Sequence, residues 1–199
     1  MPRPKTTTPG AASDSAPAEV YQLRIDLREI KPPIWRRLLV PGDITLYKLH
    51  QIIQVAMPWD SYHLYEFSIG GERFGDPSED DWEPPRNARR YRLNQMVREG
   101  QKFAYVYDFG DSWEHEIKVE KVLPAEPGVR YPVCITGKRA GPPEDCGGPW
   151  GYLEMLAALA DPKHAEHDSM LEWLGGEFAP EAFDLEETNA NLRTIKVKT

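Results

Sequence analysis

The sequence has 199 residues, of which 40% are hydrophobic and 28% charged, and its formal net charge is −8. The negative charge argues against a broad nucleic-acid-binding surface, because such a surface neutralises phosphates with Lys and Arg; a local contact stays open. No apolar run approaches the roughly 20 residues that a membrane-spanning helix needs. The chain has only two cysteines, which disfavours a secreted disulfide scaffold and makes the cytoplasm the expected compartment.

The first part of the chain predicts a tail followed by strands and a helix. Residues 1–18 are rich in Pro, Thr, Ser and Ala and predict a disordered tail, so residues 19–199 are expected to form a single domain. Apolar and polar residues alternate over Tyr21–Arg28, which predicts a half-buried strand, and Ile34–Val40 predicts a second. The apolar residues between Leu46 and Ala56 follow helical spacing.

The rest of the chain continues as short strands and then helices. His63–Ile69 alternates again, and a glycine pair leads into a short return strand through Phe74. The acidic run Glu79–Asp81 predicts a solvated loop. Further helices are predicted at residues 93–99, 152–160, 168–174 and 180–192, and a further strand at 131–136. Strands come first and helices later, which predicts an α+β fold: a mainly antiparallel sheet with hairpins, packed against several helices.

The clearest hairpin is predicted between residues 101 and 123. Its two strands carry their apolar side chains at alternate positions, and a hairpin must place both apolar sets on one face of the sheet. This requirement predicts that Phe109 lies opposite Trp113 and Tyr107 opposite His115. His115 is then expected in the core, hydrogen-bonded to a neighbour such as Tyr107.

The same register places Asp108 opposite Glu114, with Asp111 in the turn nearby. Like charges directly opposite are destabilising, so some compensation is expected. Solvation, an arginine such as Arg36 or Arg37, or a bound divalent cation would each provide it. If a cation binds, the carboxylates favour Mg²⁺ or Ca²⁺ over zinc.

A second unusual segment runs from Gly141 to Tyr152, where prolines and paired glycines surround Cys146 and lead into a helix. Glu144 or Asp145 would cap that helix, or the loop amides would receive an anion or a carboxylate. A nucleophilic thiol would need a histidine base that sequence alone does not place. The functional centre is expected where this loop meets the predicted turn.

The candidate residues therefore fall into three sets. Those with chemically competent side chains for catalysis are His63, Asp108, Asp111, His115 and Cys146. Those expected to bind a partner or to hold the two loops together are Arg36, Arg37, Trp113, Glu144 and Asp145. Those that could ligate a divalent cation are Asp108, Asp111, Glu114, Glu144 and Asp145. The tryptophans Trp35, Trp59, Trp113 and Trp173 are expected to serve mainly in packing.

These motifs resemble, in order, those of the plasmid pRiA4b ORF-3-like family. The stretches that carry the resemblance are Ile30–Arg37, Leu49–Trp59, His63-Leu64, Tyr105–His115, Pro142–Gly148 and Glu172–Leu174. The resemblance implies an α+β fold and a bacterial, intracellular setting, but no reaction. The chain departs from the family at Pro58, where Gly is common, and at Gly141, where Cys is frequent.

The expected function is a non-enzymatic binding or accessory module associated with plasmids or mobile elements, because no triad, phosphate loop or dense metal motif occurs in the sequence. The alternative is a metal-dependent or thiol-dependent enzyme that uses the Asp108–Glu114 turn and the Cys146 loop. A third reading is a purely structural interaction domain. The partner would be a protein or a local stretch of nucleic acid, with no membrane involved.

Overall fold

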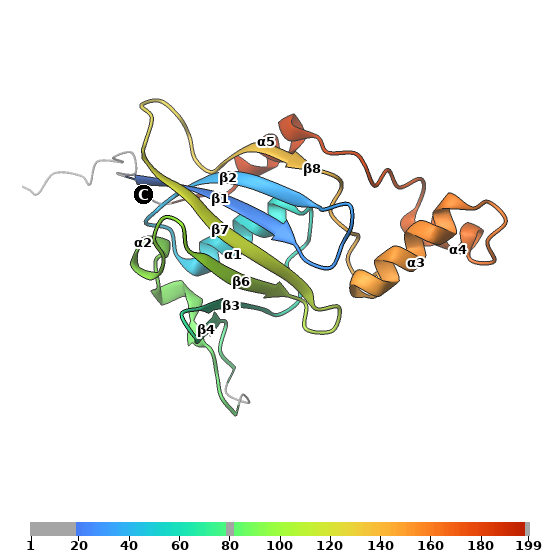
Figure 1. The fold of residues 1–199 in the computed structure, drawn as a ribbon, viewed down its shortest axis with the longest axis horizontal. Coiled ribbons are helices and arrows are strands. Elements are labelled where there is room, and N and C mark those ends of the chain that lie inside the picture. Colours follow the sequence, from blue (N-terminus) through green and yellow to red (C-terminus); the bar gives the residue numbers. More distant parts are fainter. Residues whose placement is uncertain (1–18, 79–81, 198–199) are drawn as a thin grey trace, which may run out of the picture.

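The computed structural model describes residues 19–78 and 82–197, so the predicted tail and the acidic run at 79–81 lie outside the described residues. One eight-stranded sheet organises the chain, with strand order β5-β4-β3-β6-β7-β1-β2-β8 (Figure 1). All neighbouring strands are antiparallel except β4 and β5. The strands are β1 (Glu19–Leu27), β2 (Trp35–Pro41), β3 (Tyr65–Ile69), β4 (Glu72–Gly75), β5 (Arg86–Asn87), β6 (Lys102–Tyr107), β7 (Trp113–Pro124) and β8 (Val133–Lys138).

The helices occupy the segments between and after these strands, which confirms the predicted α+β class. They are α1 (Leu46–Ala56), the short 3-10 helix η1 (Ala88–Arg90), α2 (Leu93–Met96), α3 (Gly148–Ala160), α4 (His167–Leu174) and α5 (Leu185–Leu192). Helix α1 begins where Thr45 accepts a hydrogen bond from the Lys48 amide at 3.1 Å, as an N-cap residue does. In the described part of the chain, no helix is long and apolar enough to cross a membrane.

The two faces of the sheet differ because side chains alternate along each strand. On β1, Leu23 and Ile25 are buried in the core against α1, whereas the intervening residues point outward. There Arg24 pairs with Asp26 at 2.7 Å. The antiparallel sheet is thus covered on one face and charged on the other, the usual arrangement for such sheets.

The predicted face of the β6–β7 hairpin is correct, but the predicted register is wrong. Tyr107 lies opposite Trp113 and Tyr105 opposite His115, a shift of two residues. Because the shift is even, the same apolar side chains still face the core. Glu114 therefore lies opposite Val106, and the predicted facing pair of Asp108 and Glu114 does not form.

The register shifts because Asp108 leaves the β6–β7 ladder. Its amide donates to the Leu64 carbonyl at 2.8 Å, and the Ser112 amide donates to the Asp108 carbonyl at 2.6 Å. Both Asp108 and Ser112 adopt left-handed backbone conformations, with φ of 56° and 55°. The connection is therefore a five-residue loop, 108–112, and Phe109 is displaced to the surface with 55% of its area exposed.

The C-terminal helices serve two different parts of the molecule. Helix α5 packs on β8 and α1, and Asn189 bonds both to the amide and to the carbonyl of Cys134 at 2.8 Å. It begins five residues later than predicted, where Asp184 accepts from the Glu187 amide. Helices α3 and α4 instead stand beyond the end of the sheet, and α3 begins near the 108–112 loop (Figure 1).

Candidate functional site

Three side chains from distant parts of the chain meet where strands β3 and β6 lie side by side, at the start of β3 and the end of β6: His63, Asp108 and Asp145. Strands β3 and β6 pair antiparallel, so His63 before β3 and Asp108 after β6 come to the same edge. His63 Nε2 lies 3.5 Å from Asp108 Oδ2 and 3.0 Å from Asp145 Oδ1. One potential ligand atom from each residue lies within 4.8 Å of the other two, so we call this group the His63 cluster.

Asp108 is held in place by its own loop. Its Oδ1 accepts a hydrogen bond from the Gly110 amide at 2.9 Å, which is an Asx turn. That bond leaves Oδ2 to face His63, and the residue as a whole is buried. Because Asn and Asp tolerate the left-handed conformation through such local bonds, an Asp at position 108 fits the turn.

Asp145 is oriented by a tyrosine. Tyr62 donates its hydroxyl hydrogen to Asp145 Oδ2 at 2.6 Å, while Oδ1 faces His63. The hydrogen bond from Tyr62, followed by that from His63, lowers the pKa of the Asp145 carboxyl. The same bond raises the pKa of Tyr62. Asp145 is thus an ionised carboxylate, and it is the most exposed member of the His63 cluster.

Glu144 has a different role from its neighbour. Its Oε2 accepts from the Asp60 amide at 2.8 Å and its Oε1 accepts from the Tyr107 hydroxyl. Burial and then this bond to Glu144 raise the pKa of Tyr107. Because both carboxylate oxygens already hold partners, Glu144 anchors the loop to the end of β6 rather than joining the His63 cluster.

The two loops named by the sequence analysis do contact each other. Asp111 Oδ2 accepts from the Gly147 amide at 3.1 Å, and a Cβ on Gly148 would lie 2.3 Å from the Asp111 carbonyl oxygen. Trp59 Nε1 donates to the Pro142 carbonyl at 2.9 Å. Only glycine permits the approach at position 148, so the loop that carries Asp145 is fixed against the loop that carries Asp108.

Among the described residues, neither arginine pairs with a carboxylate of these two loops, which the sequence analysis had offered as one way to compensate their charge. Arg37 forms a bidentate pair with Glu120 on the outer face of the sheet, with Nε–Oε2 at 2.6 Å and Nη2–Oε1 at 2.9 Å. Arg36 is buried and donates from Nε to the Ala56 carbonyl at the end of α1. Side-chain alternation on β2 places these neighbours on opposite faces of the sheet, where each finds a different partner.

Other candidates from the sequence also lie outside the His63 cluster. Glu114 lies beside Arg28 on the outer face, with Glu114 Oε2 3.4 Å from Arg28 Nη1. Trp113 is 1% exposed and packs in the core, so it cannot touch a partner directly. His115 is buried as predicted, but neither ring nitrogen has a hydrogen-bond partner in the described part of the chain. Burial lowers the pKa of His115 to about 4, so the ring is neutral.

The thiols are poorly suited to nucleophilic chemistry. Burial, and secondarily the nearby Asp111 carboxylate, raise the pKa of Cys146 to about 12. Burial also raises the pKa of Cys134. A reactive cysteine needs the opposite shift, because the thiolate is the nucleophile. His164 lines the same cavity as Cys146, but its Nδ1 accepts from the Glu166 amide.

Sequence reasoning named His63 as a chemically competent residue but not as a metal-ligand candidate, and it missed Tyr62 altogether. A signal was present: His63 is the first residue of a predicted strand that is followed by a tight turn. Its partner across the sheet could not be read from the sequence, because β6 lies some forty residues further along the chain.

Fold and site together define an α+β protein that carries a histidine and two carboxylates at one edge of an antiparallel sheet. The chain belongs to the plasmid pRiA4b ORF-3-like protein family, whose model matches residues 19–187. It is 44% identical to uncharacterized protein y4hQ of Sinorhizobium fredii over 160 residues, covering 79% of this chain and 82% of that protein. The crystal structure of MM3350 from Methanosarcina mazei Go1, a protein of unknown function, superposes with a TM-score of 0.79 at 40% identity, covering 86% of this chain and 98% of MM3350.

Proposed function

We propose that this protein is a binding module whose centre holds a divalent cation through His63, Asp108 and Asp145. The observation that carries the proposal is that one ligand atom from each of these residues lies within 4.8 Å of the others. A neutral imidazole and two carboxylates would balance the charge of a divalent ion. Because one ligand is a nitrogen, Mn²⁺ or Zn²⁺ fits better than the Mg²⁺ or Ca²⁺ expected from carboxylates alone.

Hydrogen-bond chemistry supports a cation at this point. The Nε2 atom of His63 carries at most one N–H, yet it faces two carboxylates at 3.0 and 3.5 Å. A cation placed between the three groups would interact with both carboxylates and with the nitrogen lone pair. The bonds that hold the carboxylates, from Gly110 to Asp108 and from Tyr62 to Asp145, are the outer-sphere supports that metal ligands usually have.

Isothermal titration of the chelator-treated protein with Mn²⁺, Zn²⁺, Mg²⁺ and Ca²⁺ tests this proposal. We expect one site per chain, with Mn²⁺ or Zn²⁺ bound more tightly than the other two ions. Asp108→Asn keeps an oxygen for the Gly110 amide but removes charge, and it should weaken binding at least about tenfold, as loss of even an outer-sphere partner does. The matched control is Asp111→Asn in the same loop, which removes the same charge but keeps an oxygen for the Gly147 amide, so it should change the affinity little. Absence of binding heat with all four ions would refute the site.

A metal-dependent enzyme is the second candidate function. It is favoured by the small number of protein ligands, since three ligands leave coordination positions for water and a substrate. Hydrolysis of chromogenic ester and phosphodiester substrates with Mn²⁺ or Zn²⁺ tests it. Turnover by the wild-type protein that disappears in Asp145→Asn would favour the enzyme. Cation binding without turnover would favour the binding module.

The family description supports the biological side of the proposal. A protein grouped with a plasmid open reading frame fits an accessory role on a plasmid or mobile element in a bacterial cytoplasm. The expected disordered tail at residues 1–18 and the single domain at 19–199 belong to the same proposal. Deleting the tail should leave the melting temperature of the protein unchanged.

A further inference from the structure

Helices α3 and α4 form a pair that the sheet does not cover. They stand beyond the end of the sheet in Figure 1, and α4 packs mainly on α3. All of α4 is described, and none of its residues is buried. Trp150 and Leu153 on α3 and Trp173 on α4 are exposed large apolar side chains, and a group of such side chains is typical of an interaction site.

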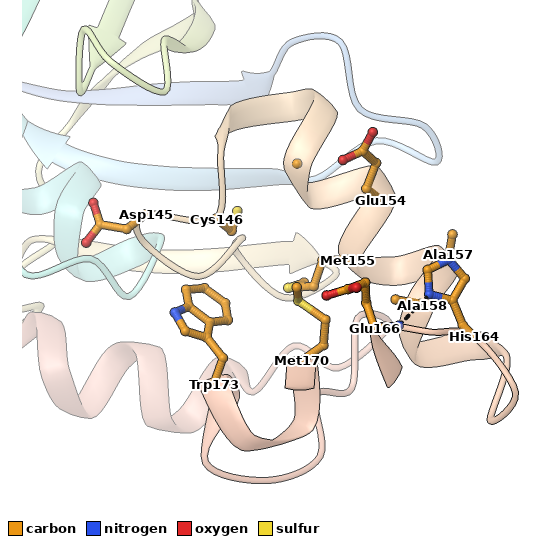
Figure 2. Close-up of a pocket in the computed structure, with 11 residues that line it drawn as sticks. Asp145, Cys146, Glu154, Met155, Ala157, Ala158, His164, Glu166, Met170 and Trp173 are labelled. Atoms are coloured by element: carbon orange, nitrogen blue, oxygen red, sulfur yellow. Dashed lines mark hydrogen bonds between the residues drawn. The ribbon is translucent and has the colours of Figure 1, made fainter. Parts of the chain in front are cut away.

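A cavity of about 580 Å³ lies between the two helices. Its apolar wall includes Met155 from α3 and Met170 and Trp173 from α4 (Figure 2). Trp173 is 49% exposed, so the prediction that it serves mainly in packing is wrong. Methionine side chains are unbranched and flexible, and they adapt to the shape of different apolar partners.

The rim of the cavity is acidic. Glu154 and Glu166 are among the lining residues, whereas the third carboxylate, Asp145, is already held by Tyr62 and His63. Between residues 148 and 177, the sequence has six acidic residues and one lysine. An occupant that combines an apolar face with positive charge therefore complements this groove best, because its cations would pair with the acidic side chains whereas an anion would be repelled.

We infer that this groove binds a basic amphipathic helix of a partner protein. The apolar face of such a helix would pack on Trp173 and Met170, above the buried Met155, and its Lys and Arg side chains would pair with Glu154 and Glu166. This is the helix-in-groove mode of recognition. The inference is independent of the proposed cation centre, although Asp145 borders both.

Fluorescence anisotropy with a labelled model peptide tests the inference. The probe is an 18-residue peptide of Leu and Lys with leucines at helical spacing, titrated with the full chain in EDTA. We expect saturable binding that weakens as salt is raised. Trp173→Gln and Met170→Gln should each weaken binding at least about tenfold, the effect of a central contact residue. The matched control is Trp82→Gln, since Trp82 is 97% exposed and lies outside the groove.

Each other outcome would overturn the inference. A Leu/Glu peptide of the same pattern that binds equally well would show apolar adhesion without charge recognition. Equal losses in Trp173→Gln and Trp82→Gln, or no saturable binding, would remove the groove as the site. If the free protein is a dimer that Trp173→Gln converts to a monomer, the occupant is a second copy of the chain. The titration contains EDTA, so peptide binding is measured without a cation, and Asp108→Asn should bind the peptide as the wild-type protein does. A failure to bind the peptide is therefore distinguishable from a failure to bind a cation.

Discussion

Replacing Gly148 with alanine tests whether the contact between the two loops holds the site together. Gly148 has a φ of +67°, and a Cβ there would lie 2.3 Å from the Asp111 carbonyl oxygen and 3.1 Å from its carbon. The left-handed conformation alone costs alanine about 1–2 kcal/mol. The collision with a backbone carbonyl adds about 1–3 kcal/mol, the usual cost of an extra methyl group in a packed place.

Gly128 provides a matched control for this substitution. Its φ is +82°, and nothing lies within 4 Å of a Cβ built on it. Alanine at position 128 therefore carries the conformational cost without the collision. Urea denaturation of both variants should show that Gly148→Ala loses about 1–3 kcal/mol more free energy of unfolding than Gly128→Ala. Equal losses would refute the reasoning that the loops are held at van der Waals contact.

The same pair of variants connects stability to function. If the His63 cluster binds a cation, displacement of the loop 142–148 moves Asp145 away from Asp108 and His63. Gly148→Ala should then weaken cation binding measured by titration, and Gly128→Ala should not. A Gly148→Ala protein that is destabilised yet binds the cation normally would show that the loop contact stabilises the fold without shaping the centre.

Three further predictions concern the buried histidines, the Cys146 thiol and the aromatic residues on either side of Asp108. Burial lowers the pKa of His50 to about 3 and that of His115 to about 4, so between pH 6.5 and 5 the unfolded chain takes up protons that the folded chain does not. The free energy of unfolding should therefore fall on acidification, by up to about 1.4 kcal/mol per pH unit for each histidine, in urea titrations at pH 7, 6 and 5; a constant value would contradict this. Cys146, whose pKa is raised to about 12, should react with iodoacetamide at pH 8 far more slowly in the folded protein than in urea, and equal rates would count against its burial. Phe109→Ala should lower the free energy of unfolding by under about 1 kcal/mol, whereas Tyr107→Ala should lower it by about 3–5 kcal/mol. A larger loss for Phe109→Ala than for Tyr107→Ala would instead favour the register predicted from the sequence, in which Phe109 lies opposite Trp113.

Local sequence signals are enough to place the individual helices and strands of this protein. Helix α1 has the predicted bounds, Leu46 and Ala56, because its apolar spacing, its threonine cap and the following Pro58 are all local signals. The strands from β1 to β3 lie within two residues of their predicted positions, because alternation marks a half-buried strand without reference to its neighbours. Face parity in the β6–β7 hairpin was likewise correct.

The register of that hairpin and the set of residues that meet at the site depend instead on contacts between distant segments. Asp108 leaves the hairpin ladder because its amide bonds to the Leu64 carbonyl, a partner more than forty residues earlier. Asp145 meets His63 because a loop more than eighty residues further along is held by Asp111 and Gly148. The sequence showed which side chains have suitable chemistry, but which of the many carboxylates come together depends on contacts between distant segments, and no local spacing encodes them.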